Sequence, residues 1–285
     1  MLGKLFKHDM RALAKSLAWV QLGVIGLSVL ATMVTAIEIR IGRASYESAL
    51  SNPALFAVFS MMQILTVLGI GASFLLVLFF ICRHFYRNLF CDEGYLTHTL
   101  PVSPASLLWS KVLAGFVWEL ISFFVVVLAV LFFLTCGTSP DTLFNPEPYR
   151  VIGEIFSLEI PQEAWRLVAP FVLYALFAVL SALLQLYLAL TIGCAIGRRH
   201  RVAIAIGFYI VIAFVIGIVN AVFSIPVLIA NVFSFSLYPQ AAAMETALVN
   251  SFSGALWWQT AIYAAFATVF FLTAEYLMRK KLNLQ

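Results

Sequence analysis

The sequence predicts an all-α membrane protein with six transmembrane helices, and two observations favour this fold class. Of the 285 residues, 63% are hydrophobic and 11% are charged, whereas about a quarter of the residues in a soluble domain are charged. The apolar residues are also gathered into six long runs. Each run is continuously apolar instead of alternating with polar residues, which favours helices over the strands of a membrane barrel.

Each of the six runs is long enough to cross a bilayer. A helix needs roughly 20 apolar residues to span a hydrocarbon core about 30 Å thick. The predicted spans are residues 17–37, 57–81, 112–134, 168–196, 202–223 and 256–278. We therefore divide the chain into an N-terminal segment, residues 1–16, and a six-span transmembrane domain, residues 17–285.

The N-terminal segment, residues 1–16, has the pattern of an amphipathic helix that lies in the membrane interface. Apolar and basic side chains recur on opposite sides of it at helical spacing. The apolar set is Leu2, Leu5, Phe6, Met10, Leu13 and Leu17, and the basic set is Lys4, Lys7, Arg11 and Lys15. The segment is expected to bind membrane lipids as an anchor. A second possibility is that it also contacts a cytoplasmic partner.

The basic residues predict the side of the membrane that each loop occupies. With the N-terminus in the cytoplasm, 13 of the 17 Lys and Arg residues fall in cytoplasmic segments, and Arg40, Arg43, Arg150 and Arg166 fall outside. The positive-inside rule therefore places both termini in the cytoplasm. The net charge of +4 reflects this asymmetry. It does not indicate nucleic-acid binding, because no basic patch is interleaved with exposed aromatic residues.

The longest cytoplasmic segment is residues 82–111, between the second and third spans. The pair Ser103-Pro104 is typical of a helix start, with proline at the first helical position. We expect a short acidic helix, a proline-containing turn, and a second helix that continues into the third span.

One stretch of this segment carries a family resemblance. Its residues are Asp92-Glu93-Gly94-Tyr95-Leu96-Thr97, then Thr99-Leu100-Pro101-Val102-Ser103, and then Leu107, Leu108, Ser110 and Lys111. This stretch resembles the cytoplasmic loop of ATP-binding-cassette type-2 permeases from Gram-positive bacteria. The six spans with both ends inside are similar to that family over the whole chain.

The resemblance implies a function for the loop. In that family the loop carries a coupling helix that docks into a groove of a separate ATPase subunit. The ATPase-coupling residues here would be Asp92, Glu93, Gly94, Tyr95, Leu96 and Thr97. The resemblance also implies a multi-pass protein of the bacterial plasma membrane, with a second copy of this permease or a related permease as a further partner.

The sequence contains no nucleotide-binding motif of its own. No G-x-x-x-x-G-K-[ST] phosphate loop occurs, so ATP and magnesium are expected on the partner subunit, and no cofactor is expected in this chain. Neither H-E-x-x-H nor G-x-S-x-G occurs, and the four cysteines do not have metal-type spacing. We therefore do not expect this chain to be an enzyme.

Two long segments are expected on the outer side. Residues 135–167 contain five acidic and two basic residues, a net charge of −3, which either favours a cationic cargo or merely follows the topology. Residues 224–255 are apolar but interrupted by Pro226 and Pro239. This pattern predicts a re-entrant hairpin between spans five and six, where the type-2 permeases also carry re-entrant helices.

Glu119 is the ionisable residue placed deepest inside a predicted span. A charged group at that depth is costly and is a candidate functional residue. Two roles are open: Glu119 either lines a transport route, or it is structural and pairs with a cytoplasmic-side Arg or Lys or forms a hydrogen bond between helices. Glu275 is expected to form a local ion pair with Arg279, one turn away.

Other polar and small residues in the spans are expected to hold helices together. The amides of Gln63, Gln185 and Asn220 are candidates for hydrogen bonds between helices. Gly193 and Gly197 form a small-xxx-small pair that favours close helix packing, with a dimer seam as the alternative.

The predicted function is the membrane-spanning permease subunit of an ATP-driven exporter, coupled through residues 82–111 to a separate ATPase. One alternative is a membrane accessory or immunity protein that captures an antimicrobial. A membrane-embedded lipid-modifying enzyme is a weaker alternative, since Glu119 alone would have to supply its chemistry. The cargo stays open, because fold and site are separate questions.

Overall fold

The protein is all-α, as predicted, and each predicted span falls within one helix. The computed structural model describes residues 2–44, 53–91, 102–137, 165–197, 200–237 and 241–280. The helices are α1 (Leu2–Ala44), α3 (Pro53–Phe90), α5 (Pro104–Gly137), α7 (Trp165–Ile196), α8 (Arg201–Leu237) and α9 (Ala241–Lys280). All six are long and apolar enough to cross a membrane, and no strand occurs within these ranges.

The outward-facing side chains confirm a multi-pass membrane protein. Many large apolar side chains are more than half exposed, such as Val67 at 70%, Leu75 at 69% and Phe214 at 69%. A soluble monomer rarely exposes contiguous apolar patches of more than a few hundred Å². Side chains of this kind on all six helices fit a location among lipid tails.

The helices are longer than the predicted spans. Helix α1 contains 43 residues without a proline, so residues 2–16 form its first turns and are continuous with the first span. The predicted amphipathic pattern is present, because Leu13 and Leu17 are buried while all four basic residues of this segment are exposed. Its position in the membrane interface stays a prediction.

The predicted interruption at Pro226 is absent, since α8 is helical through this residue to Leu237. A proline removes one backbone hydrogen bond, and a membrane helix tolerates that loss where neighbouring groups satisfy the freed carbonyl. Pro239 lies outside the described residues. Residues 224–237 and 241–255 are therefore helical, and a re-entrant placement of this region in the membrane stays a prediction.

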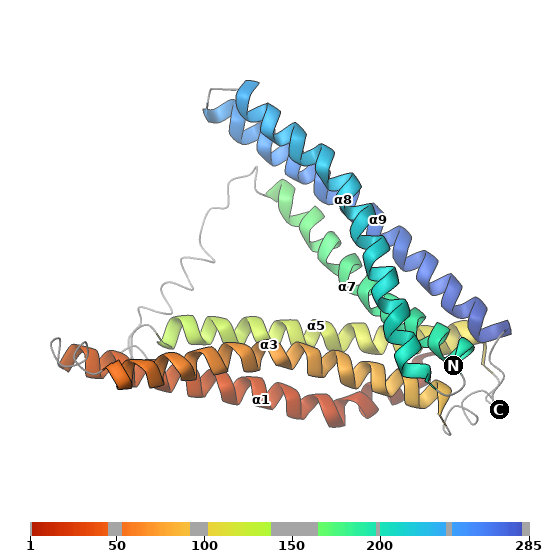
Figure 1. The fold of residues 1–285 in the computed structure, drawn as a ribbon, viewed down its shortest axis with the longest axis horizontal. Helices are drawn as coiled ribbons and strands as arrows, with labels where there is room; N and C mark the ends of the chain where they lie inside the picture. The colour runs from red at the N-terminus through yellow and green to blue at the C-terminus, as the bar shows by residue number, and fades with distance from the viewer. Residues whose placement is uncertain are drawn as a thin grey trace. The chain divides into compact units, whose positions relative to one another are not determined.

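Two compact units make up the chain, and we describe each separately. The first comprises the described residues of Met1–Phe6, His84–Phe116 and Glu159–Gln285, and the second those of Lys7–Arg83 and Val117–Leu158. In the first unit, α7 packs against both α8 and α9, and α8 packs against α9 (Figure 1).

Side-chain amides join the helices of the first unit. Gln185 Nε2 donates to the Tyr209 carbonyl oxygen at 3.3 Å, and Asn220 Nδ2 donates to the Tyr263 hydroxyl at 3.2 Å. These two bonds connect α7 to α8 and α8 to α9, as the sequence predicted for both amides. In a bilayer such bonds between helices contribute about 0.6–2 kcal/mol each.

The predicted glycine pair packs α7 closely against α8. A Cβ atom added to Gly193 would lie 2.6 Å from the Arg201 carbonyl oxygen and 2.7 Å from the Ala205 Cβ. A Cβ added to Gly197 would lie 2.9 Å from Ile204 Cδ1. The small residues thus serve packing within the chain.

In the second unit, α1, α3 and α5 lie side by side (Figure 1). Gln21 Nε2 on α1 donates to the Ser122 hydroxyl on α5 at 2.5 Å. Leu27 on α1 covers Gly69 on α3, where an added Cβ would lie 2.8 Å from Leu27 Cδ1. One polar contact and one apolar contact therefore join α1 to its two neighbours.

Candidate functional site

The predicted ATPase-coupling residues, 92–97, lie outside the described residues. The structure describes the chain on either side of them, where α3 ends at Phe90 and α5 begins at Pro104. We call the residues that fix these two helix ends the loop anchors. They are Phe85, Phe90, Trp109, Lys111, Tyr187, Arg201 and Phe271.

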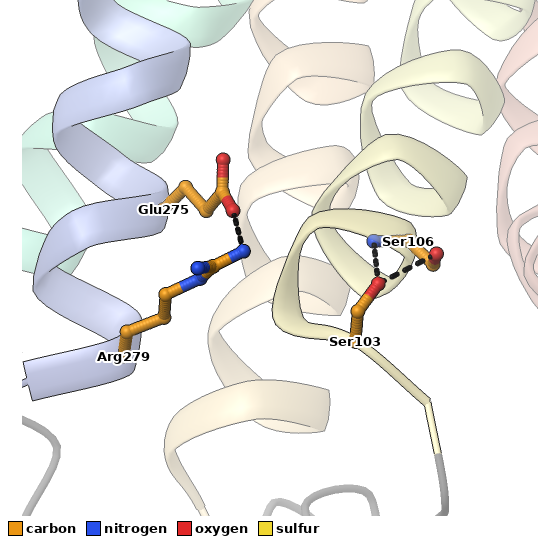
Figure 2. Close-up of polar contacts among 4 residues, drawn as sticks. All are labelled: Ser103, Ser106, Glu275 and Arg279. Atoms are coloured by element: carbon orange, nitrogen blue, oxygen red, sulfur yellow. Dashed lines mark hydrogen bonds and ion pairs between the residues drawn. The ribbon is translucent and has the colours of Figure 1, made fainter.

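Ser103 begins α5 as the sequence predicted. Its hydroxyl accepts a hydrogen bond from the Ser106 backbone N–H at 3.3 Å, and its carbonyl oxygen accepts from the Leu107 N–H at 3.1 Å (Figure 2). The hydroxyl satisfies a backbone donor that has no partner within the helix, and Pro104 has no N–H to leave unsatisfied. These contacts fix the start of α5 at Ser103-Pro104.

Arg201, the first residue of α8, holds the last turn of α3. Its guanidinium Nη1 donates to the Phe90 carbonyl oxygen at 3.4 Å. The last carbonyls of a helix lack partners within the helix, and a cation there also complements the helix dipole. The Tyr86 side chain lies beside the same guanidinium. The α3 side of the coupling segment is thus bonded to α8.

Tyr187 on α7 joins the two flanking helices. Its ring is 1% exposed and stacks on Phe85 of α3, with centroids 3.9 Å apart and planes 6° from parallel. Its hydroxyl donates to the Lys111 carbonyl oxygen on α5 at 3.3 Å. A single side chain of α7 therefore contacts both α3 and α5 close to the coupling segment.

The first turns of α5 also contact α9. The Trp109 ring lies against Phe271, with centroids 4.6 Å apart. Lys111, two residues further on, is 5% exposed, so the family-like Lys that enters the third span is buried. The helix turns on either side of residues 92–101 thus contact α7, α8 and α9.

Glu119, the second predicted candidate, lies on α5 in the second unit and is partly buried. Its Oε1 atom is buried and has no hydrogen-bond partner, and no ion pair joins it to another residue in the described ranges. Among the described residues, therefore, no Lys or Arg forms the ion pair that a structural role of Glu119 as a paired carboxylate would require. Glu275, by contrast, pairs with Arg279 at 2.5 Å as predicted (Figure 2).

Three important residues were not identified from the sequence as functional. Tyr187 was read as part of an apolar span, and Arg201 only as a topology signal. Asp9 is 2% exposed, although it lies in the amphipathic segment. Its spacing of four from both Leu5 and Leu13 places it on the apolar side, and this signal could have revealed its burial.

No group of three metal-ligating side chains occurs among the described residues, and the cysteines there, Cys82, Cys91 and Cys194, are free. Comparisons with protein-family models, with curated proteins and with solved structures find no match to this chain.

Proposed function

We propose that this chain is the membrane-spanning permease subunit of an ATP-driven exporter, coupled through residues 82–111 to a separate ATPase subunit. The observation that carries the proposal is the set of loop anchors. Arg201 bonds the end of α3, and Tyr187 bonds the beginning of α5, on either side of the motif that resembles a coupling helix.

In the proposed mechanism, ATP binding closes the ATPase subunit and displaces the coupling segment. Because α7, α8 and α9 hold both ends of this segment, the displacement moves that bundle and changes which side of the membrane the cargo can reach. ATP and magnesium bind to the partner subunit. A second copy of this chain, or a related permease, completes the transport unit in the bacterial plasma membrane.

Charged residues at Tyr95 and Leu96 are expected to break the contact with the ATPase. A Tyr95→Glu, Leu96→Glu variant replaces the two large side chains of the proposed contact by charges, so ATPase copurified with the tagged chain from native membranes should fall at least about tenfold. Transport of cargo into inverted vesicles should be lost as well, because no ATPase is bound to drive it. Undiminished copurification and export would place the docking surface elsewhere.

Ser103→Asp is the matched control for this experiment. It adds a negative charge beside the same segment, yet Asp also accepts the N-terminal backbone N–H of a helix. The control variant should therefore fold, keep the start of α5, and copurify with the ATPase at the wild-type level.

Cysteine labelling is expected to place both termini in the cytoplasm. In a cysteine-free background, Asn145→Cys should react with a membrane-impermeant maleimide in intact cells, because the 13-to-4 distribution of basic residues places residues 135–167 outside. Asp92→Cys should react only after the cells are permeabilised. The reverse pattern would invert the topology and place the coupling segment on the wrong side for a cytoplasmic ATPase.

A further inference from the structure

A polar cluster inside the second unit has hydrogen-bonding capacity that the protein itself does not use. We call it the Gln21 cluster, and its members are Gln21 on α1 and Trp118, Glu119 and Ser122 on α5. Successive residues of a helix are about 100° apart, so Ser122 lies between Trp118 and Glu119 within an arc of about 100°. Since Gln21 bonds Ser122, this is the face of α5 that meets α1.

The hydrogen bonds of Ser122 fix the orientation of the Gln21 amide. The Ser122 hydroxyl donates its one proton to the Trp118 carbonyl oxygen at 2.8 Å. It can therefore only accept from Gln21, which must present its NH₂ group to the hydroxyl. The amide oxygen, Gln21 Oε1, is directed elsewhere and has no hydrogen-bond partner.

Two further polar atoms of the cluster also lack a hydrogen-bond partner. The Trp118 indole Nε1 and the Glu119 Oε1 are buried without a hydrogen-bond partner. Gln21 and Trp118 are 8% and 9% exposed, so bulk solvent does not compensate them. Buried polar groups are nearly always hydrogen-bonded, so an unpaired acceptor on α1, together with an unpaired acceptor and an unpaired donor on the facing side of α5, favours a ligand.

The charge of the cluster defines the ligand. Glu119 has no ion-pair partner in the part of the chain that the structure describes, and Cys82 on α3, which is near enough to interact with it electrostatically, carries no positive charge. Carboxylates within membrane spans are normally paired. Glu119 as a whole residue is partly exposed, although its Oε1 atom is buried.

We propose that the Gln21 cluster binds the protonated primary amine of an amphiphilic molecule that carries an oxygen atom beside the amine. The Glu119 carboxylate and Gln21 Oε1 accept N–H bonds from the ammonium group, and the Trp118 N–H donates to the neighbouring oxygen. This binding requires no ATPase, so it can succeed or fail independently of the proposed export function.

Competition binding to the full-length protein in lipid nanodiscs tests the proposal. Radiolabelled octadecylamine is displaced by ligands of the same chain length, and protein-free nanodiscs give the background. Sphingosine, which has an amine and hydroxyl groups, should compete best. Octadecyltrimethylammonium, which lacks N–H donors, should bind about tenfold more weakly than octadecylamine, and octadecanol should not compete.

Substitutions then assign the binding to the cluster. Glu119→Gln should weaken octadecylamine binding at least about tenfold, and Gln21→Met about threefold or more. Trp118→Phe should weaken sphingosine and leave octadecylamine unchanged. Glu275→Gln is the matched control, because that carboxylate is already paired with Arg279, and it should bind like the wild type.

Three results would overturn the proposal: wild-type amine affinity in Glu119→Gln, competition by octadecanol equal to that of octadecylamine, or equal losses in Glu119→Gln and Glu275→Gln. If Glu119→Gln does not fold, Gln21→Met decides, and unchanged amine affinity in that variant contradicts the assignment.

Discussion

Tyr187→Ala is expected to destabilise the protein more than any other single truncation near the coupling segment. It removes a ring that is 1% exposed, together with its stack on Phe85 and its bond to the Lys111 carbonyl. Truncation of a buried aromatic costs about 3–5 kcal/mol in a folded core. The apparent Tm of the purified protein in detergent should fall by roughly 6–20 °C, at about 2–4 °C per kcal/mol for a chain of this size class.

Two companion variants separate the ring from its hydroxyl. Tyr187→Phe keeps the stack and loses one hydrogen bond, so its cost should be about 0.5–1.5 kcal/mol. Tyr209→Ala truncates a tyrosine whose side chain is exposed, and its Tm should stay near the wild-type value. If Tyr187→Ala and Tyr209→Ala have the same Tm, Tyr187 does not hold α3 and α5 to α7.

Gly193→Ala is expected to separate α7 from α8. The added methyl group would lie 2.6 Å from the Arg201 carbonyl oxygen and 2.8 Å from the Ala205 backbone nitrogen. Neither backbone atom can rotate away, so the helices must shift, at about 1–3 kcal/mol or more. The intrinsic helix preference of alanine over glycine offsets only about 1 kcal/mol of this. Because Arg201 also bonds Phe90, the shift should reduce export as well as Tm.

Gly207→Ala is the matched control on the neighbouring helix. An added Cβ there meets nothing within 4 Å, so the variant should be neutral or about 0.5–1 kcal/mol more stable. The two identical substitutions are thus expected to change Tm in opposite directions. Ala205→Gly should partly restore Gly193→Ala, since it removes the Cβ at 2.7 Å but leaves the Arg201 carbonyl. A gain in Tm for both glycine variants would contradict the close packing.

Features that depend on local sequence were predicted correctly. Ser103-Pro104 begins α5, Glu275 pairs with Arg279, and the six spans fall on the six helices, because capping, ion pairs one turn apart and span length each depend on neighbouring residues. The ends of α1 at Ala44 and of α8 at Leu237 were not predicted, because hydropathy marks the apolar part of a helix and these two helices continue beyond it.

The anchors of the candidate site depend on contacts between distant residues. Tyr187 and Lys111 are 76 positions apart, and Arg201 and Phe90 are 111 apart. No periodicity connects such residues, and an apolar span gives no indication of which of its faces meets another helix. The family resemblance of residues 92–97 rests on the sequence and stays a prediction, whereas the residues that contact their flanking helices could not be identified from the sequence.

The hydrogen bond between Gln21 and Ser122 affects the order in which the chain can assemble. Hydroxyls such as Thr66 and Thr268 bond carbonyls four residues earlier in their own helix, so they are satisfied as soon as that helix forms. The Gln21 amide must wait for a residue that is synthesised 101 positions later. At about 5–20 residues per second this delay is roughly 5–20 s. During that interval the Gln21 amide lacks its Ser122 partner, and we expect α1 to be most accessible to quality-control proteases and chaperones then.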